Sequence, residues 1–267
     1  MRILVTNDDG VAAPGLWALV EELNRIAEVV VVVPDREQSG VGTAVSLHHP
    51  LRVRPVRPMV ADVQTHVVEG TPADSVIIAL RMLVKDNVDL LISGINEGSN
   101  LGNDVLISGT VGAAFQGYFH GLTSIAISVG SLEATHFDVA AKVGSFLAEQ
   151  HAAGNLPQRV LLNVNLPDVP LEEITGIELT RLGERTFTDA VRMGQIKEGH
   201  DGKRSYYWIL HSAPEWKKGE GTDIWALEQK KISITPLHSD LTSHEHSAPL
   251  EGVCSSVFQS ITSASPA

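Results

Sequence analysis

The opening stretch, MRILVTNDDGVAAPGLWALVEELNRIAEVVVVVP (residues 1–34), decides the fold class. Its residues 2–6 are a short apolar run that predicts a buried strand. Residues 29–34 are a β-branched run ended by proline, typical of a strand covered on both faces. Between the two runs, apolar side chains recur at the spacing of a helix, at Leu16, Leu19, Val20, Leu23 and Ile26. Strand, helix and strand in this order form a βαβ unit and predict a parallel sheet.

The pattern of strands and helices continues to Pro167. Two alternating segments, 51–57 and 65–70, predict an antiparallel excursion. Residues 71–84 predict a helix that Thr71 caps, with Pro72 at its first position and Asp74 in its first turn. We expect further strands at 88–94, 123–130 and 159–167, helices at 110–121 and 137–152, and long loops at 35–46 and 95–109.

After Pro167 the pattern changes to short strand-like segments, at 176–182, 204–211, 222–227 and 231–237. Three of the four tryptophans lie between residues 208 and 225, and charged or glycine-rich connectors separate the segments. We interpret this part as a β-rich extension, not as a continuation of the βα series.

The charge of the chain limits its partners. The 267 residues carry a formal net charge of −12. Long nucleic acids and anionic membranes are polyanions, so an acidic protein of this kind is not expected to bind them. A small phosphate ligand stays compatible with the charge if a bound cation reverses the local field.

The cysteine count and the apolar runs predict a cytoplasmic protein. Cys254 is the only cysteine, which suits a reducing compartment, and its apolar neighbours predict that it is buried. The first apolar run has five residues, which is too short for the core of a signal peptide. No stretch approaches the 18 or so apolar residues of a membrane span, so we expect no membrane association.

Polar clusters follow the predicted strands at the edge where an open parallel sheet binds ligands. They are Asn7-Asp8-Asp9-Gly10, Ser39-Gly40, Ser93-Gly94-Ile95-Asn96 and, before a predicted helix, Ser108-Gly109-Thr110. Taken alone, Asn-Asp-Asp-Gly is a common turn sequence, because Asn and Asp accept local backbone bonds and Gly adopts positive φ. Its position after a buried strand favours a functional role.

The paired carboxylates of Asp8 and Asp9 repel each other unless a cation lies between them. Oxygen ligands suit Mg²⁺ or Mn²⁺. Ser39 and Asn96 offer two further neutral oxygens. The sequence therefore predicts a divalent-metal site at these residues.

The loop and helix from Ser93 to Phe119 contain no Lys or Arg. An anion bound there needs other donors, and the backbone N–H groups at the predicted helix start, at Gly109, Thr110 and Val111, form a suitable anion site. The hydroxyls of Ser108 and Thr110 add donors. The alternative is that both hydroxyls only cap the helix.

Four segments resemble the SurE family, the stationary-phase survival protein. They are MRILVTNDDG (1–10), PDREQSGVG (34–42), SGINEGSNLGNDVLISGTVGAA (93–114) and GTDIWALEQKKISITPLHSDLT (221–242). The resemblance covers nearly the whole chain in order. It implies a metal-dependent phosphatase of nucleoside 5′- and 3′-monophosphates, with some members also acting on polyphosphate. It implies Asp8, Asp9, Ser39 and Asn96 as the metal ligands.

The resemblance also implies an α/β fold with a Rossmann-like three-layer core, a mostly parallel sheet and a C-terminal β-hairpin extension. That extension is exchanged between subunits of a homodimer or homotetramer. We accordingly expect a catalytic core at 1–167, an oligomerisation extension at 168–230, and a strand with a C-terminal segment returning to the core at 231–267.

The expected mechanism follows from these residues. One Mg²⁺ or Mn²⁺ per subunit orients a water that attacks phosphorus in line. Asp8 or Asp9 assists as base, and the sequence does not choose between them. We expect the phosphate contacts to come from Ser39, Gly40, Asn96, Ser108, Gly109 and Thr110.

Three other functions are considered. An aspartyl-phosphate mechanism resembles haloacid-dehalogenase chemistry, but the Asp-x-Asp-x-Thr pattern is absent from residues 8–12. A non-catalytic nucleotide-binding or sensing module gains little from an acidic pair. A glycosyltransferase needs a second βα domain, which residues 168–267 do not supply.

Overall fold

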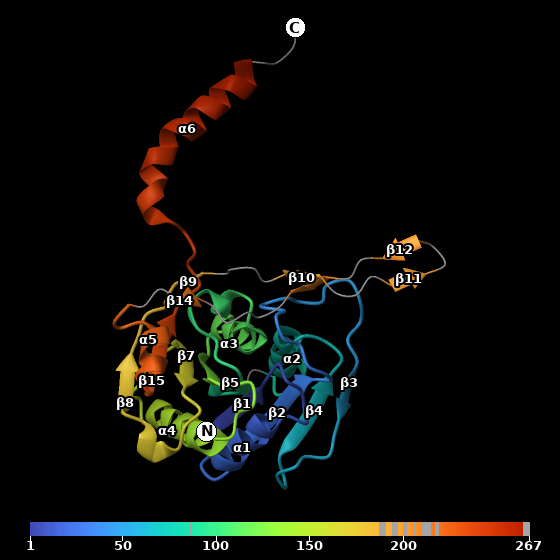
Figure 1. The fold of residues 1–267 in the computed structure, drawn as a ribbon. Coiled ribbons are helices and arrows are strands. Elements are labelled where there is room, and N and C mark those ends of the chain that lie inside the picture. Colours follow the sequence, from blue (N-terminus) through green and yellow to red (C-terminus); the bar gives the residue numbers. More distant parts are fainter. Residues whose placement is uncertain are drawn as a thin grey trace. The chain divides into compact units, whose positions relative to one another are not determined.

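The computed structural model describes residues 1–85, 87–186, 191–193, 197–199, 202–204, 207–209, 215–216 and 219–263. The chain divides into two compact units, Met1–Leu237 and His238–Ala267 (Figure 1).

A nine-stranded sheet forms the centre of the larger unit. Every neighbouring pair is parallel except β3 with β4 and β15 with β7. In spatial order the strands are β3 (Val53–Pro55), β4 (Gln64–Val68), β2 (Glu28–Pro34), β1 (Arg2–Thr6), β5 (Leu90–Glu97), β6 (Thr123–Val129), β7 (Leu161–Leu166), β15 (Lys231–Leu237) and β8 (Gly176–Leu179). The mostly parallel sheet and the antiparallel excursion at β3–β4 are confirmed.

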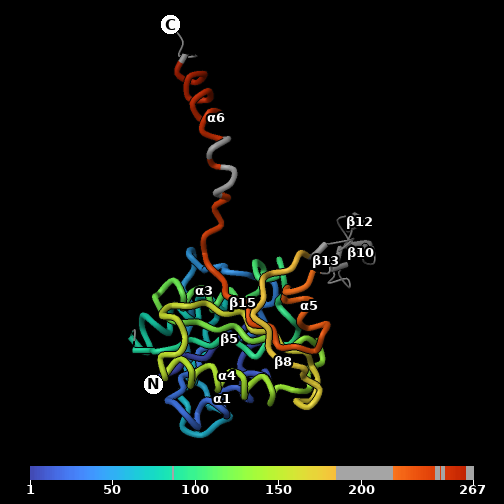
Figure 2. The backbone as a smooth tube through the Cα atoms, turned by 90° about the vertical axis from the view of Figure 1, so that its left-hand side faces the viewer, coloured from blue at the N-terminus to red at the C-terminus, as the bar shows by residue number. Residues whose placement is uncertain are grey.

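Helices cover both faces of this sheet, which gives three layers. Helices α1 (Pro14–Leu23) and α4 (Phe137–Ala152) lie on one face, and α2 (Pro72–Ile78) and α3 (Gly109–Phe119) pack together on the other. In Figure 2, α1 and α4 lie below the sheet and α3 above it. Ile3 and Val5 of β1 belong to the core on the α1 side, and Leu4 to the core on the α2 side. Successive side chains of a strand point to opposite faces of the sheet, so each strand contributes to two apolar cores.

Local sequence explains the ends of α2. Thr71 accepts a hydrogen bond from the Asp74 N–H at 3.0 Å, and the Asp74 carboxylate accepts from the Thr71 N–H at 2.9 Å. This is a capping box, and it confirms the predicted start of the helix. The helix continues as a π-helical turn at Ala79–Leu83. Two short 3₁₀ helices lie at Gly102–Leu106 and Leu171–Glu173.

The described residues of the extension form three antiparallel strand pairs. They are β9 (Arg185–Thr186) with β14 (Glu215–Trp216), β10 (Val191–Met193) with β13 (Tyr207–Ile209), and β11 (Lys197–Gly199) with β12 (Gly202–Arg204). Each pair lies inside the previous one along the chain, which is the connectivity of a hairpin. The predicted C-terminal hairpin is confirmed. Of the predicted segment 204–211, the part outside Arg204 and Tyr207–Ile209 lies outside the described residues.

Three local predictions are wrong. Residues 222–227 form not a strand but most of helix α5 (Asp223–Glu228), because the Thr222 hydroxyl accepts the Trp225 N–H and starts a helix. The predicted loop at 95–109 is shorter, since β5 extends to Glu97 and a 3₁₀ helix follows at Gly102–Leu106. Cys254 is exposed on helix α6 (His244–Ser263) in the smaller unit.

None of the helices within the described residues has both the length and the apolar character that crossing a membrane requires. The strand β15 belongs to the central sheet, while the divisions of the chain at residues 167 and 230 stay predictions.

Candidate functional site

The candidate site lies where the order of the sheet reverses. From β1 the chain proceeds through β2 and β4 in one direction, and from β5 through β6 and β7 in the other. Ligands of open α/β sheets bind at such a switch point, beyond the carboxyl ends of the strands. A cleft of about 420 Å³ opens there, with Asp8, Ser39, Asn96 and Ser108 in its lining. Residues from the segments after β1 and β2 and from the end of β5 thus meet in one cleft.

Asp8 is held by the start of helix α3. Its side chain is buried, and the Thr110 hydroxyl donates a hydrogen bond to its Oδ1 at 2.5 Å. Burial raises the pKa of Asp8, and the hydrogen bond from Thr110 offsets part of that rise. A Cβ on Gly109 would lie 2.8 Å from the Asp8 Cβ. Glycine is therefore needed where the helix start packs against this carboxylate.

Asp9 lacks a protein partner for one of its oxygens. Its Oδ2 is buried and accepts no hydrogen bond from the described residues. Burial raises the pKa of Asp9 to about 7, and the negative charges of Asp8, Glu97 and Glu37 add to the rise. A partly buried carboxylate that has one unsatisfied oxygen and lies among other carboxylates is costly unless a cation neutralises it.

Ser39 and Gly40 lie on the loop after β2. The Ser39 hydroxyl donates to Glu37 Oε1 at 2.8 Å, which leaves its oxygen lone pairs available. Gly40 has a φ of +74° and nothing within 4 Å of the position of a Cβ, so the backbone is open to a ligand there. On the β5 side, Asn96 donates its Nδ2 to the Gly98 carbonyl at 2.6 Å. That bond uses the amide nitrogen of Asn96 and leaves the amide oxygen for another partner.

The two hydroxyls near the start of α3 have local partners. Ser108 is the N-cap and accepts the Val111 N–H at 3.1 Å, while the Thr110 hydroxyl bonds to Asp8. The alternative that both hydroxyls cap the helix is confirmed for Ser108, which takes the Val111 N–H, and is wrong for Thr110, whose hydroxyl bonds to Asp8 instead. Ser108 lines the cleft, whereas Asp9, Gly109 and Thr110 are not among its lining residues. Phosphate contacts from Ser108, Gly109 and Thr110 stay predictions.

Sequence reasoning missed the acidic groups around the pair. Glu37, Glu97 and Asp104 line the same cleft as Asp8. Glu97 directly follows Asn96, and Glu37 lies two residues before Ser39, so the signal was present in the motifs themselves. None of the fifteen described residues that line the cleft is Lys, Arg or His. An anionic ligand therefore finds no cationic side chain in this lining.

These residues fit a divalent cation. Carboxylate, hydroxyl and amide oxygens from Asp8, Asp9, Ser39 and Asn96 form the hard oxygen set that Mg²⁺ and Mn²⁺ prefer. The buried Oδ2 of Asp9 supplies the unsatisfied acceptor that such an ion would engage.

Comparisons with known proteins identify the family of this chain. Residues 3–189 match a family model described as the survival protein SurE. A curated protein of Dehalococcoides mccartyi (strain CBDB1), named 5′-nucleotidase SurE, is 46% identical over 243 residues, covering 90% of each chain. One of the same name from Vibrio parahaemolyticus is 48% identical over 246 residues, covering 92% of this chain and 91% of its own.

A solved structure has the same fold. The crystal structure of the SurE protein from Aquifex aeolicus superposes with a TM-score of 0.78 at 37% identity. The match covers 95% of this chain and 99% of that one.

Proposed function

Since the chain belongs to the SurE family, we propose that it is a divalent-metal-dependent nucleotidase. It hydrolyses nucleoside 5′-monophosphates to nucleoside and phosphate. The observation that carries the proposal is the pair Asp8 and Asp9, with the Asp9 Oδ2 buried and unpartnered at the switch point of the sheet. Curated relatives named 5′-nucleotidase SurE support the choice of substrate. Hydrolysis of 3′-monophosphates and of short polyphosphate is expected from the family resemblance.

The cleft explains why this chemistry needs a cation. A phosphate monoester carries negative charge, and the lining offers four carboxylates and no cationic side chain among its described residues. We assign Asp8, Asp9, Ser39 and Asn96 as the groups that hold one Mg²⁺ or Mn²⁺ per subunit. When bound, such an ion supplies positive charge to a phosphate oxygen and lowers the pKa of a water molecule.

The protein's own groups orient the substrate and the acid pair. Thr110 fixes one oxygen of Asp8, so that the carboxylate keeps a single orientation. The exposed backbone at Gly40 lets a phosphate approach closely. Ser39 and Asn96 lie beside it, and the start of α3, at Ser108, Gly109 and Thr110, adds the positive end of a helix dipole. Asp8 or Asp9 acts as base toward the attacking water.

A purely nucleotide-binding module is not favoured, because paired carboxylates repel a bound phosphate unless a cation is present. We further propose that the protein acts in the cytoplasm, and that it forms a homodimer or homotetramer through the β-hairpin extension. Its acidic charge of −12 disfavours long nucleic acids as partners.

The test is release of inorganic phosphate from a panel of nucleoside 5′- and 3′-monophosphates, with Mg²⁺, with Mn²⁺ and with EDTA. Asp9→Asn removes one charge of the pair, and Asp138→Asn makes the same change at an exposed position on α4. We expect metal-dependent release that Asp9→Asn abolishes and Asp138→Asn preserves. A protein that binds nucleotides but releases no phosphate from them with either metal would overturn the proposal that it is an enzyme.

A further inference from the structure

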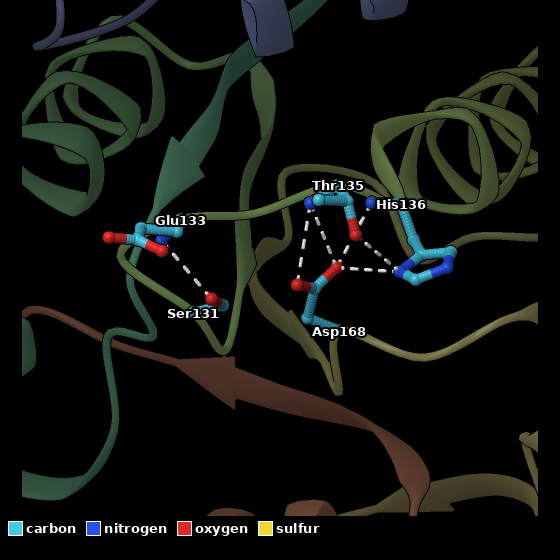
Figure 3. A network of polar contacts seen from close by, with 5 residues as sticks. All are labelled: Ser131, Glu133, Thr135, His136 and Asp168. Atoms are coloured by element: carbon cyan, nitrogen blue, oxygen red, sulfur yellow. Dashed lines mark hydrogen bonds and ion pairs between the residues drawn. The ribbon is translucent and has the colours of Figure 1, made fainter.

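The loop between β6 and α4 reaches the cleft. Gly130, Ser131 and Leu132 are among the lining residues. The start of the loop is tied to the sheet, because the Gly130 N–H donates to the Leu166 carbonyl at 2.8 Å. The Ser131 hydroxyl oxygen accepts the Glu133 N–H at 3.1 Å and turns the chain (Figure 3).

A single carboxylate fastens the other end of this loop. Asp168, which follows β7, accepts the Thr135 N–H at 3.1 Å and the His136 N–H at 3.0 Å. The Nδ1 of His136 also lies 2.8 Å from Asp168 Oδ1. Figure 3 shows the Asp168 carboxylate facing the Thr135 backbone and the His136 ring. Three groups of Thr135 and His136 thus bond to one side chain, which anchors this end of the loop.

The residue that this loop carries into the cleft is apolar. The Leu132 side chain is 77% exposed, although burial of a leucine side chain away from water is favourable. Its Cδ2 lies 3.1 Å from the position of a Cβ on Gly98, the residue whose carbonyl accepts the Asn96 amide. Leu132 therefore lies over the turn that positions a proposed metal ligand, close to the polar end of the cleft.

Leu132 and Ile107 are the only large apolar side chains among the described lining residues, and Ile107 is 42% exposed. The rest of the lining is acidic, amide, hydroxyl or glycine. Ligand sites combine polar groups that fix orientation with apolar surface that packs against the ligand. A nucleoside monophosphate has both characters, with a charged phosphate at one end and a flat ring at the other.

We propose that Leu132 determines specificity by packing against the nucleobase of the substrate. Asp168 is a positioning residue that holds Leu132 there through the backbone of Thr135 and His136. The inference rests on the proposed nucleotidase function. An aliphatic side chain packs equally well against any nucleobase. Leu132 therefore favours binding of nucleotides over phosphate esters that lack a base, and it does not select one base over another.

The experiment compares adenosine 5′-monophosphate as substrate with ribose 5-phosphate as competitive inhibitor, in wild type and in Leu132→Ala. We expect the KM for the nucleotide to rise about tenfold with kcat little changed, and the Ki of ribose 5-phosphate to stay the same. Leu179→Ala is the matched control, because Leu179 is 76% exposed on β8 and does not line the cleft. Its KM should equal that of wild type.

Asp168→Ala tests the positioning role with the same two measurements. We expect Asp168→Ala to raise the KM for the nucleotide by a similar factor, and to have no further effect when Leu132 is already alanine. Asp168→Asn should raise the KM less, because its amide oxygen still accepts a hydrogen bond. A fall in kcat with no change in KM would assign Asp168 a structural role only and overturn its part of the proposal.

The outcomes separate this inference from the function on which it rests. Equal changes for nucleotide and ribose 5-phosphate, or no change for either, in a Leu132→Ala protein that hydrolyses nucleotides would overturn the base contact alone. A wild-type protein that releases no phosphate from any nucleotide would overturn the proposed function and the base contact with it.

Discussion

The Thr110 hydroxyl donates to Oδ1 of Asp8 at 2.5 Å, across 102 positions of the chain. The bond joins the start of α3 to the end of β1 in the buried wall of the cleft. It gives one oxygen of Asp8 a fixed partner and leaves the other directed toward Gly109, where a side chain would collide with it.

Replacement of this hydroxyl tests its role in orienting Asp8. In Thr110→Val the shape is kept and the hydroxyl donor is lost, so the buried Asp8 carboxylate loses one of its hydrogen bonds. We expect a loss of about 1–3 kcal/mol in the free energy of unfolding, and a fall in kcat of about tenfold to a hundredfold from the misplaced carboxylate. Urea unfolding and steady-state kinetics measure both. Thr110→Ser should restore most of the activity, and a fully active valine variant would refute the role.

The contact at Gly109 gives a second prediction. In Gly109→Ala the new Cβ would lie 2.8 Å from Asp8 Oδ2 and 3.0 Å from the Gln38 carbonyl oxygen. We expect a stable protein that binds Mn²⁺ more weakly, because Asp8 must move away. Gly252→Ala is the control, since nothing lies within 4 Å of its Cβ position. Unchanged Mn²⁺ affinity in Gly109→Ala would contradict the prediction.

Asp223 links the start of the 3₁₀ helix at Gly102–Leu106 to the segment between β8 and β9. It is fully buried, and its two oxygens accept the N–H groups of Gly102 and Gly183, each at 2.8 Å. In Asp223→Ala these donors lose their acceptor, and we expect the free energy of unfolding to fall by more than about 2 kcal/mol. Urea denaturation measures the change. Asp138→Ala, at an exposed site on α4, should cause almost none, and equal effects of the two variants would argue against the link.

The pH dependence of stability follows from Asp168. Burial raises its pKa, but the hydrogen bonds from His136 and Thr135 outweigh burial, so the pKa of Asp168 lies below its ordinary value. A carboxyl group whose pKa is lower in the folded state stabilises the fold at pH values above its unfolded-state pKa of about 3.9. This stabilisation is lost as the pH falls through the folded-state pKa. The difference in unfolding free energy between wild type and Asp168→Asn should therefore shrink as the pH falls below about 4. A difference that grows toward acid pH would show the opposite linkage.

Much of the core could be predicted because its signals are local and periodic. The spacing of Leu16, Leu19 and Leu23 identifies α1, and the capping pair Thr71 and Asp74 identifies the start of α2. The β-branched run after Glu28 has no polar face, which is the pattern of a strand covered on both sides. The position of the polar clusters after the predicted strands then predicts that they meet at one edge of the sheet.

Other features depend on contacts that no local pattern encodes. Residues 223–228 make a helix of six residues, too short for periodicity to distinguish it from a strand. Cys254 has apolar neighbours, yet it is exposed on α6. The direction of the Thr110 hydroxyl, and the approach of Glu37 and Glu97 to Asp9, arise only when distant segments pack together.

Calorimetric titration of Mn²⁺ into the full chain tests the central claim, that Asp8 and Asp9 form a metal site, most directly. We expect one ion per subunit for wild type and for Asp138→Asn, and binding at least tenfold weaker for Asp9→Asn, because that variant removes one of two carboxylate ligands. Equal Mn²⁺ affinity in wild type and in a folded Asp9→Asn protein would contradict the claim, since the acidic pair would then not hold the metal.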